Sequence, residues 1–125
     1  MGQKKILLVD DSKVTRRSIC LLLEKNGYEV LTLDNAEDLL TSAENYSDVR
    51  LILLDIGLPG MDGLTALQYI NQLSSLNHIP IIILSGYSDR TNVTKALSLN
   101  IVDYIIKPYI APKLLVRIEQ AMKTT

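Results

Sequence analysis

The chain contains 125 residues, of which 47% are hydrophobic, and its 13 basic and 14 acidic side chains leave a formal net charge of -1. This length suits one domain with one core, and the apolar content excludes a disordered segment. The charge balance argues against a domain that binds nucleic acid by neutralising phosphates, and one cysteine with one histidine argues against a disulfide or a zinc site. No run is long and apolar enough to predict a membrane span or a signal peptide, so we expect a cytoplasmic protein.

The first half of the chain predicts two strand–helix pairs. The continuous apolar run Ile6–Val9 is typical of a strand buried on both faces, and Ser12–Asn26 is bounded by residues that begin and end helices. Residues Glu29–Leu33 alternate between polar and apolar, which indicates an edge strand. Asp34 followed by Glu37 resembles a capping box, so we expect a second helix that ends near residue 46.

The second half repeats this pattern three times. Apolar runs predict strands at Leu51–Leu54, Ile81–Leu84 and Tyr104–Ile106. Apolar residues at helical spacing predict helices at Gly63–Leu73, Ser88–Leu99 and Ile110–Met122. Five strands that alternate with five helices predict an α/β, doubly wound fold with a parallel sheet and right-handed crossovers.

Polar residues follow the buried strands at the points where these strands end. They are Asp10, Asp11, Asp55, Ser85 and Lys107. The carboxyl ends of parallel strands lie at one edge of the sheet, where such folds bind ligands. A single charged residue at a strand end is explained as well by contact with water as by a functional role. Three carboxylates, a hydroxyl and an ammonium together favour a functional site.

These residue types suggest phosphoryl transfer. Close carboxylates repel one another and need a counter-charge, and a site made of oxygen ligands suits Mg2+, with Mn2+ as an alternative. Lys107 would add a fixed positive charge, as phosphoryl transfer requires. Asp55 stands alone after its strand and is therefore the candidate nucleophile, whereas Asp10 and Asp11 would hold the metal ion.

Four blocks of sequence carry a resemblance to a known family. They are Ile6–Asp11, Leu53–Gly63, Pro80–Gly86 and Asp103–Tyr109. Together with their spacing, they resemble the receiver domain of two-component response regulators, with a single receiver domain over residues 1–125. The resemblance implies a flavodoxin-like fold whose five-stranded sheet has the order 2-1-3-4-5.

The resemblance also implies roles in metal binding and phosphoryl transfer. Asp55 would accept a phosphoryl group from a phosphohistidine on a sensor histidine kinase or a phosphotransfer protein. Asp11 and Asp55 would bind Mg2+ directly, Asp10 through a water molecule, and Gly57 through its backbone carbonyl.

Around the phosphoryl group, Ser85 and Lys107 would bind its oxygens, and the Lys107–Pro108 peptide would be cis. We further expect Tyr87, two residues after Ser85, to shield the phosphoryl group and slow its hydrolysis.

A conformational switch is implied as well. Ser85 would move toward the phosphoryl group and Tyr104 would turn inward, although Tyr104 also fits an ordinary aromatic residue of a strand. The surface of the fourth helix, fifth strand and fifth helix would then change and control a downstream effector or an output domain. Such an output domain could follow residue 125, and a homodimer formed on phosphorylation is compatible with the pattern. No direct contact with nucleic acid or membrane is expected.

Two rival interpretations fit the sequence less well, because the first predicted strand ends in the adjacent pair Asp10 and Asp11 and because the acidic residues and the lysine are all present. A phosphohydrolase of the haloacid dehalogenase type also forms an aspartyl phosphate, but its nucleophile follows the first strand in an Asp-X-Asp pattern. A receiver-like module that is never phosphorylated would normally lose an acidic residue or the lysine. The expected protein is therefore a signalling switch and not an enzyme, and it catalyses only its own phosphoryl transfer and dephosphorylation.

Other charged residues are given ordinary structural interpretations. Arg16 and Arg17 in the first predicted helix are interpreted as a solvated face rather than a nucleic-acid patch. Asp62 is interpreted as a turn residue or as the cap of the third helix.

Overall fold

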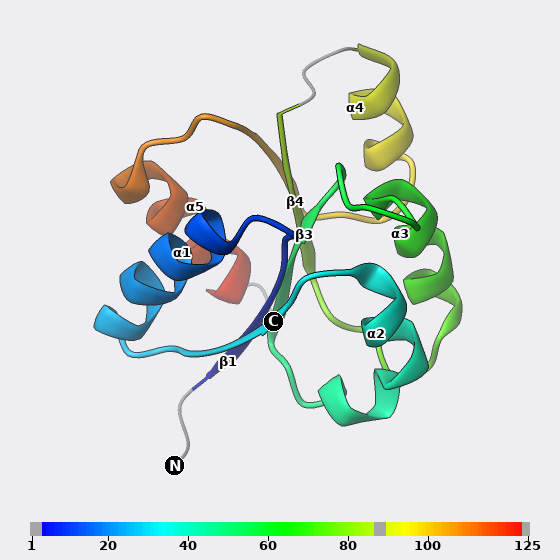
Figure 1. Ribbon diagram of the computed structural model, residues 1–125, viewed down its shortest axis with the longest axis horizontal. Helices are drawn as coiled ribbons and strands as arrows, with labels where there is room; N and C mark the ends of the chain where they lie inside the picture. Colours follow the sequence, from blue (N-terminus) through cyan, green and yellow to red (C-terminus); the bar gives the residue numbers. More distant parts are fainter. Residues whose placement is uncertain (1–3, 87–89, 124–125) are drawn as a thin grey trace.

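A five-stranded parallel sheet forms the centre of the protein and has helices on both faces (Figure 1). The protein is represented by a computed structural model that describes residues 4–86 and 90–123, with the backbone alone for residues 90–93. The strands are β1 (Lys5–Val9), β2 (Glu29–Leu33), β3 (Leu51–Asp55), β4 (Ile81–Ser85) and β5 (Asp103–Ile106). Their order, β2-β1-β3-β4-β5, confirms the predicted doubly wound fold, with β2 at an edge.

The helices divide into two layers. They are α1 (Lys13–Lys25), α2 (Ala36–Thr41), α3 (Gly63–Gln72), α4 (Arg90–Leu97) and α5 (Ala111–Lys123), with a short 3-10 helix η1 (Ala43–Tyr46) after α2. Helices α1 and α5 cover one face of the sheet, and α2, α3 and α4 cover the other (Figure 1). Within the described ranges, every helix is too short or too polar to cross a membrane.

Side chains of the central strands alternate between two cores. In β1, Leu7 and Val9 pack with the layer of α2 and α3, whereas Ile6 and Leu8 pack with α1 and α5. This alternation follows from the two-residue period of a strand. Because both faces are covered, each of these four side chains is fully buried, which accounts for the continuous apolar runs in the sequence.

The second helix differs from the prediction at both ends. Asn35, not Asp34, is its cap, because the Asn35 side chain accepts a hydrogen bond of 2.8 Å from the backbone N–H of Asp38. Glu37 does not complete a capping box; its carboxylate instead accepts a hydrogen bond of 3.3 Å from the N–H of Met61. The α-helix ends at Thr41, and the remaining predicted turns form η1.

The fourth helix is shorter than predicted. It ends at Leu97, two residues before the expected end, and the predicted start at Ser88 lies outside the described residues. Asn100, which follows this helix, has a φ of 63°, a left-handed conformation that asparagine tolerates better than most residues.

The end of β3 packs unusually closely against the start of α3. A Cβ atom on Gly63 would lie 2.3 Å from the backbone oxygen of Asp55 and 2.7 Å from the Cα of Ile56. The N–H of Gly63 donates a 2.9 Å hydrogen bond to the Ile56 carbonyl. Asp62 caps the helix by accepting a 2.8 Å bond from the Thr65 N–H, which confirms one of its two predicted roles. Gly63 therefore allows α3 to begin directly against the strand that carries Asp55.

We predict that Gly63→Ala destabilises the protein by about 2 kcal/mol, because the new methyl group would overlap backbone atoms that cannot rotate away. Gly86→Ala is the matched control, since a Cβ there meets no described atom within 4 Å. Urea unfolding of both variants gives the two free energies. Equal effects of the two substitutions would contradict this explanation of Gly63.

Candidate functional site

Polar residues from four strand ends converge at the carboxyl edge of the sheet. Asp10 follows β1, Asp55 ends β3, Ser85 ends β4 and Lys107 follows β5. One carboxylate oxygen from each of Asp10, Asp11 and Asp55 lies within 4.8 Å of the other two. The structure therefore brings the three predicted acidic residues together.

Asp10 is fully buried, and each of its three oxygen atoms accepts a hydrogen bond. The N–H of Ser12 donates a 2.8 Å hydrogen bond to Oδ1, and the Lys107 ammonium donates a 3.0 Å bond to Oδ2. The backbone oxygen of Asp10 accepts a 2.7 Å bond from Nη1 of Arg16. A buried carboxylate needs such partners, because burial without them would strongly disfavour its charge.

Asp55 is also buried, but its side chain keeps 10% of its surface exposed. The N–H of Gly57 donates a 3.0 Å hydrogen bond to Oδ1, and Oδ2 lies 3.5 Å from the Lys107 ammonium. Burial raises the pKa of Asp55 and outweighs the Gly57 hydrogen bond and the Lys107 charge, which act to lower it. Asp55 is therefore a desolvated carboxylate with an accessible edge.

Lys107 joins the two buried carboxylates. Burial acts to lower the pKa of its ammonium group, but the hydrogen bond to Asp10 and the charges of Asp55 and Asp10 outweigh burial and raise it. The lysine is therefore charged at neutral pH. The Lys107–Pro108 peptide is cis, as the family resemblance implies.

The set of donors fits a hard divalent cation. Three carboxylates lie close together and one ammonium group contacts two of them, so the cluster has an excess of negative charge. Asp11 is exposed and can reach a hydrated ion, whereas Asp10 and Asp55 lie deeper. All-oxygen donors of this kind suit Mg2+ or Mn2+. The Gly57 N–H faces Asp55, and a metal-binding role for the Gly57 carbonyl stays a prediction.

Ser85 and Tyr104 occupy the places expected of them in the sheet. Ser85 is fully buried, and its backbone oxygen accepts a 2.7 Å hydrogen bond from the N–H of Lys107. Tyr104 is half-buried against the core on the face of the sheet that α2, α3 and α4 cover. The switch roles of both residues stay predictions, and the predicted shield, Tyr87, lies outside the described residues.

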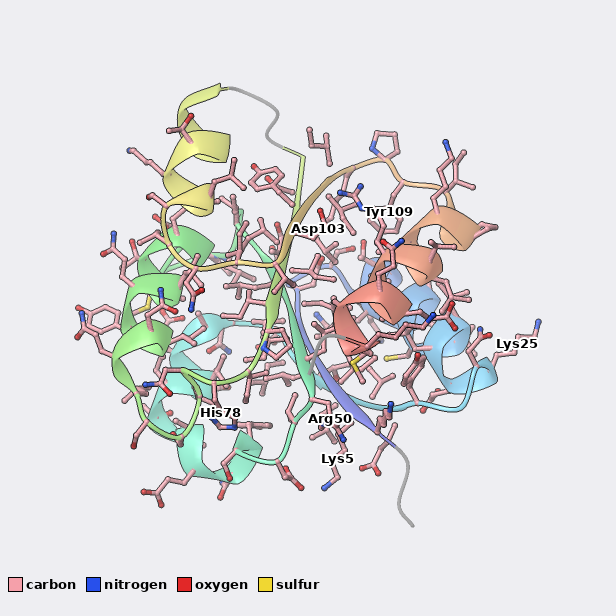
Figure 2. All side chains as sticks on the ribbon, turned by 180° about the vertical axis from the view of Figure 1, so that it is seen from behind. Lys5, Lys25, Arg50, His78, Asp103 and Tyr109 are labelled. Carbon is pink, nitrogen blue, oxygen red and sulfur yellow. The ribbon has the colours of Figure 1, made fainter. Side chains whose placement is uncertain are left out.

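Two contributors to this region were missed in the sequence. Arg16 was expected on a solvated face, but it is half-buried and bonded to the Asp10 backbone, whereas its neighbour Arg17 is exposed as expected. Tyr109 is half-buried at the same end of the sheet (Figure 2), where burial raises the pKa of its hydroxyl. A spacing of six residues between Asp10 and Arg16 matches no common sequence motif, which explains why this bond was overlooked.

The single histidine of the chain lies far from this site. His78 is exposed and stands before β4, at the amino end of the sheet, near Arg50 and Lys5 (Figure 2). The candidate site therefore contains no histidine.

We predict that Asp55→Asn stabilises the metal-free protein at pH 7 by about 1 kcal/mol, a usual scale for one substitution. The folded-state pKa of Asp55 is raised, so its ionised form costs stability at neutral pH. That cost disappears as the pH falls below the usual range of an aspartate, whereas asparagine still accepts the Gly57 hydrogen bond. Urea unfolding at several pH values without divalent cations measures the difference, and an advantage for the variant that does not change with pH would contradict this account.

Comparisons with known proteins agree with this geometry. The family model of the response regulator receiver domain matches residues 6–119. The chemotaxis protein CheY of Treponema pallidum (strain Nichols) is 36% identical over 123 residues, which cover 95% of this chain and 83% of that protein. The chain spans about half the length of other curated relatives that are named as transcriptional regulators.

Two solved structures extend the similarity to the fold. A CheY-like receiver domain protein from Methanospirillum hungatei JF-1 is 32% identical, with a TM-score of 0.90 over 98% of this chain and 96% of that one. The receiver domain of a sensor histidine kinase from Pseudomonas aeruginosa PAO1, which has a magnesium ion in its active site cleft, is 28% identical, with a TM-score of 0.86 over 98% and 99% of the two chains. This chain therefore belongs to the response regulator receiver domain family, which acts in the phosphorylation-based signalling of two-component systems.

Proposed function

We propose that the chain is a phosphorylation-activated switch that works in the cytoplasm. Asp55 would accept the phosphoryl group from a phosphohistidine of a sensor histidine kinase or a phosphotransfer protein. The observation that carries this proposal is the position of Asp55, a desolvated carboxylate with an accessible edge, 3.5 Å from the Lys107 ammonium and grouped with two further carboxylates. Membership of the receiver family supports the same assignment.

In the proposed transfer, an oxygen of Asp55 attacks phosphorus and forms an acyl phosphate. The bond from phosphorus to the imidazole nitrogen breaks, and its electron pair stays on that nitrogen. The two oxygens of Asp55 are not equivalent, because the Gly57 N–H already bonds Oδ1 and Lys107 lies beside Oδ2. These contacts would orient the carboxylate for attack.

A divalent cation completes the proposed site. Asp11 and Asp55 would bind Mg2+ directly, Asp10 through water, and Gly57 through its carbonyl. When bound, the ion supplies positive charge that neutralises the oxygens of the transferring phosphoryl group. The excess of carboxylates over ammonium groups supports this part of the proposal, as does the magnesium ion in the related Pseudomonas receiver domain.

Lys107 and Ser85 would bind the phosphoryl group after transfer. The Lys107 ammonium lies 3.0 Å from Asp10 and 3.5 Å from Asp55, so a modest shift would let it reach a phosphoryl oxygen on Asp55. Additional negative charge on Asp55 would favour that shift. The Ser85 hydroxyl would move toward another phosphoryl oxygen, and Tyr104 would turn inward in response.

The proposed output is a change in the surface formed by α4, β5 and α5. Leu97, Ile106, Ile110 and Val116 are exposed apolar residues of these elements and the β5–α5 loop. Apolar side chains of this kind suit contact with a downstream effector, an output domain or a second copy of the chain. The rearrangement would alter that contact by changing the packing of β5.

We predict that incubation with Mg2+ and a small acyl-phosphate donor adds one phosphoryl group to the chain, measured by intact mass. Asp55→Asn should abolish the gain, because an amide does not form the acyl phosphate. Asp62→Asn is the matched control, since Asp62 is an exposed aspartate and asparagine also caps helices well. It should keep the full gain.

A gain that persists in Asp55→Asn would show that another group is the acceptor. No gain in the wild-type chain, with the fold intact and Mg2+ present, would favour the receiver-like module that is never phosphorylated. Steady release of inorganic phosphate from many simple phosphate esters would instead favour the phosphohydrolase.

A further inference from the structure

We propose that Arg16 is a positioning residue of the acidic site. Its guanidinium group would hold the backbone carbonyl of Asp10 and thereby set where the β1–α1 loop presents Asp11. This proposal deepens the proposed function, because it assumes that Asp11 is used at the site.

The contact is short, specific and partly shielded from solvent. Nη1 of Arg16 donates a 2.7 Å hydrogen bond to the Asp10 oxygen, and the arginine side chain is half-buried. A hydrogen bond from a charged donor is stronger than one between neutral groups. The bond links the first turns of α1 back to the end of β1.

The same loop is held by two further bonds that act close to Asp10. The Ser12 N–H donates to Asp10 Oδ1 at 2.8 Å, and the Ser12 hydroxyl oxygen accepts from the Thr15 N–H at 3.2 Å. These bonds fix the Asp10 side chain and the helix cap. Among the described residues, the carbonyl of Asp10 has Arg16 as its side-chain partner.

Holding this carbonyl affects Asp11 directly. The Asp10 C=O and the Asp11 N–H belong to one planar peptide unit, so the direction of the carbonyl sets the orientation of the chain entering Asp11. Asp11 is exposed and lacks the burial that fixes Asp10 and Asp55. Its carboxylate would therefore depend most on the backbone for its position.

A purely electrostatic role for Arg16 predicts the opposite result. A positive charge near the carboxylates repels a divalent cation, so its removal would strengthen Mg2+ binding. Loss of a positioning bond would weaken Mg2+ binding instead. The sign of the change separates the two roles.

The first experiment is a calorimetric titration of the folded chain with Mg2+. Arg16→Met, which keeps an apolar stem of similar length, should raise the dissociation constant about tenfold, the low end of the range for groups that orient metal ligands. Arg17→Met is the matched control for charge, because the Arg17 side chain is exposed and has no hydrogen bond or ion pair among the described residues. It should leave Mg2+ binding unchanged or slightly stronger.

The second experiment needs no metal ion. Amide hydrogen exchange should become faster at Ser12 in Arg16→Met, whereas the buried strand β4 should keep its protection. An effect on stability alone would speed exchange in both places. If Mg2+ does not bind to the wild-type chain, the proposed metal site fails, but the Ser12 amide still decides whether Arg16 positions the loop. Mg2+ binding to Arg16→Met that is as tight as to the wild type, or unchanged exchange at Ser12, would overturn the proposal.

Discussion

The site depends on the close approach of three carboxylates, two of them buried beside one ammonium group. Asp10 and Asp55 are both buried, and Lys107 touches each of them, at 3.0 Å and 3.5 Å. One lysine cannot neutralise three carboxylates, so the folded chain keeps negative charge in a place where charge is costly. A divalent cation would offset this excess of negative charge, whereas a transferred phosphoryl group would add to it.

Strand order, close backbone packing and hydrogen bonds together keep these side chains in place. The parallel order of the strands brings four carboxyl ends to one edge, and Gly63 lets α3 begin directly against the end of β3. Asp10 is held by Ser12 and by Lys107. A backbone hydrogen bond joins Ser85 to Lys107, the residue that supplies the ammonium group. In the proposed switch, a change at the site would reach β5 through this contact in the sheet and would alter the surface of α4, β5 and α5.

The parts of the structure that could be predicted from the sequence are the strands, which follow from periodicity, and the polar cluster, which follows from the residues at strand ends. The continuous apolar runs predicted the strands of the sheet, and the acidic residues after them predicted a cluster of carboxylates that the structure shows. The start of α2 was predicted wrongly because Asp34 and Asn35 are adjacent and either side chain can cap a helix. The sequence pattern does not show which of the two is the cap, and in the structure it is Asn35. They also failed for Arg16, because a side chain that reaches a backbone carbonyl leaves no repeating signal in the sequence. Leu97 shows a third limit: it fits a helical period but is 62% exposed.

The central claim is that the excess of carboxylates creates a site for a divalent cation, and the dependence of thermal unfolding on Mg2+ tests it most directly. A ligand that binds the folded state alone raises stability with the logarithm of its concentration above its dissociation constant. We expect Mg2+ to raise the melting temperature of the wild type and of Asp62→Asn equally, and to have little effect on Asp11→Asn. Equal stabilisation of all three proteins, or none of the wild type, would contradict the account.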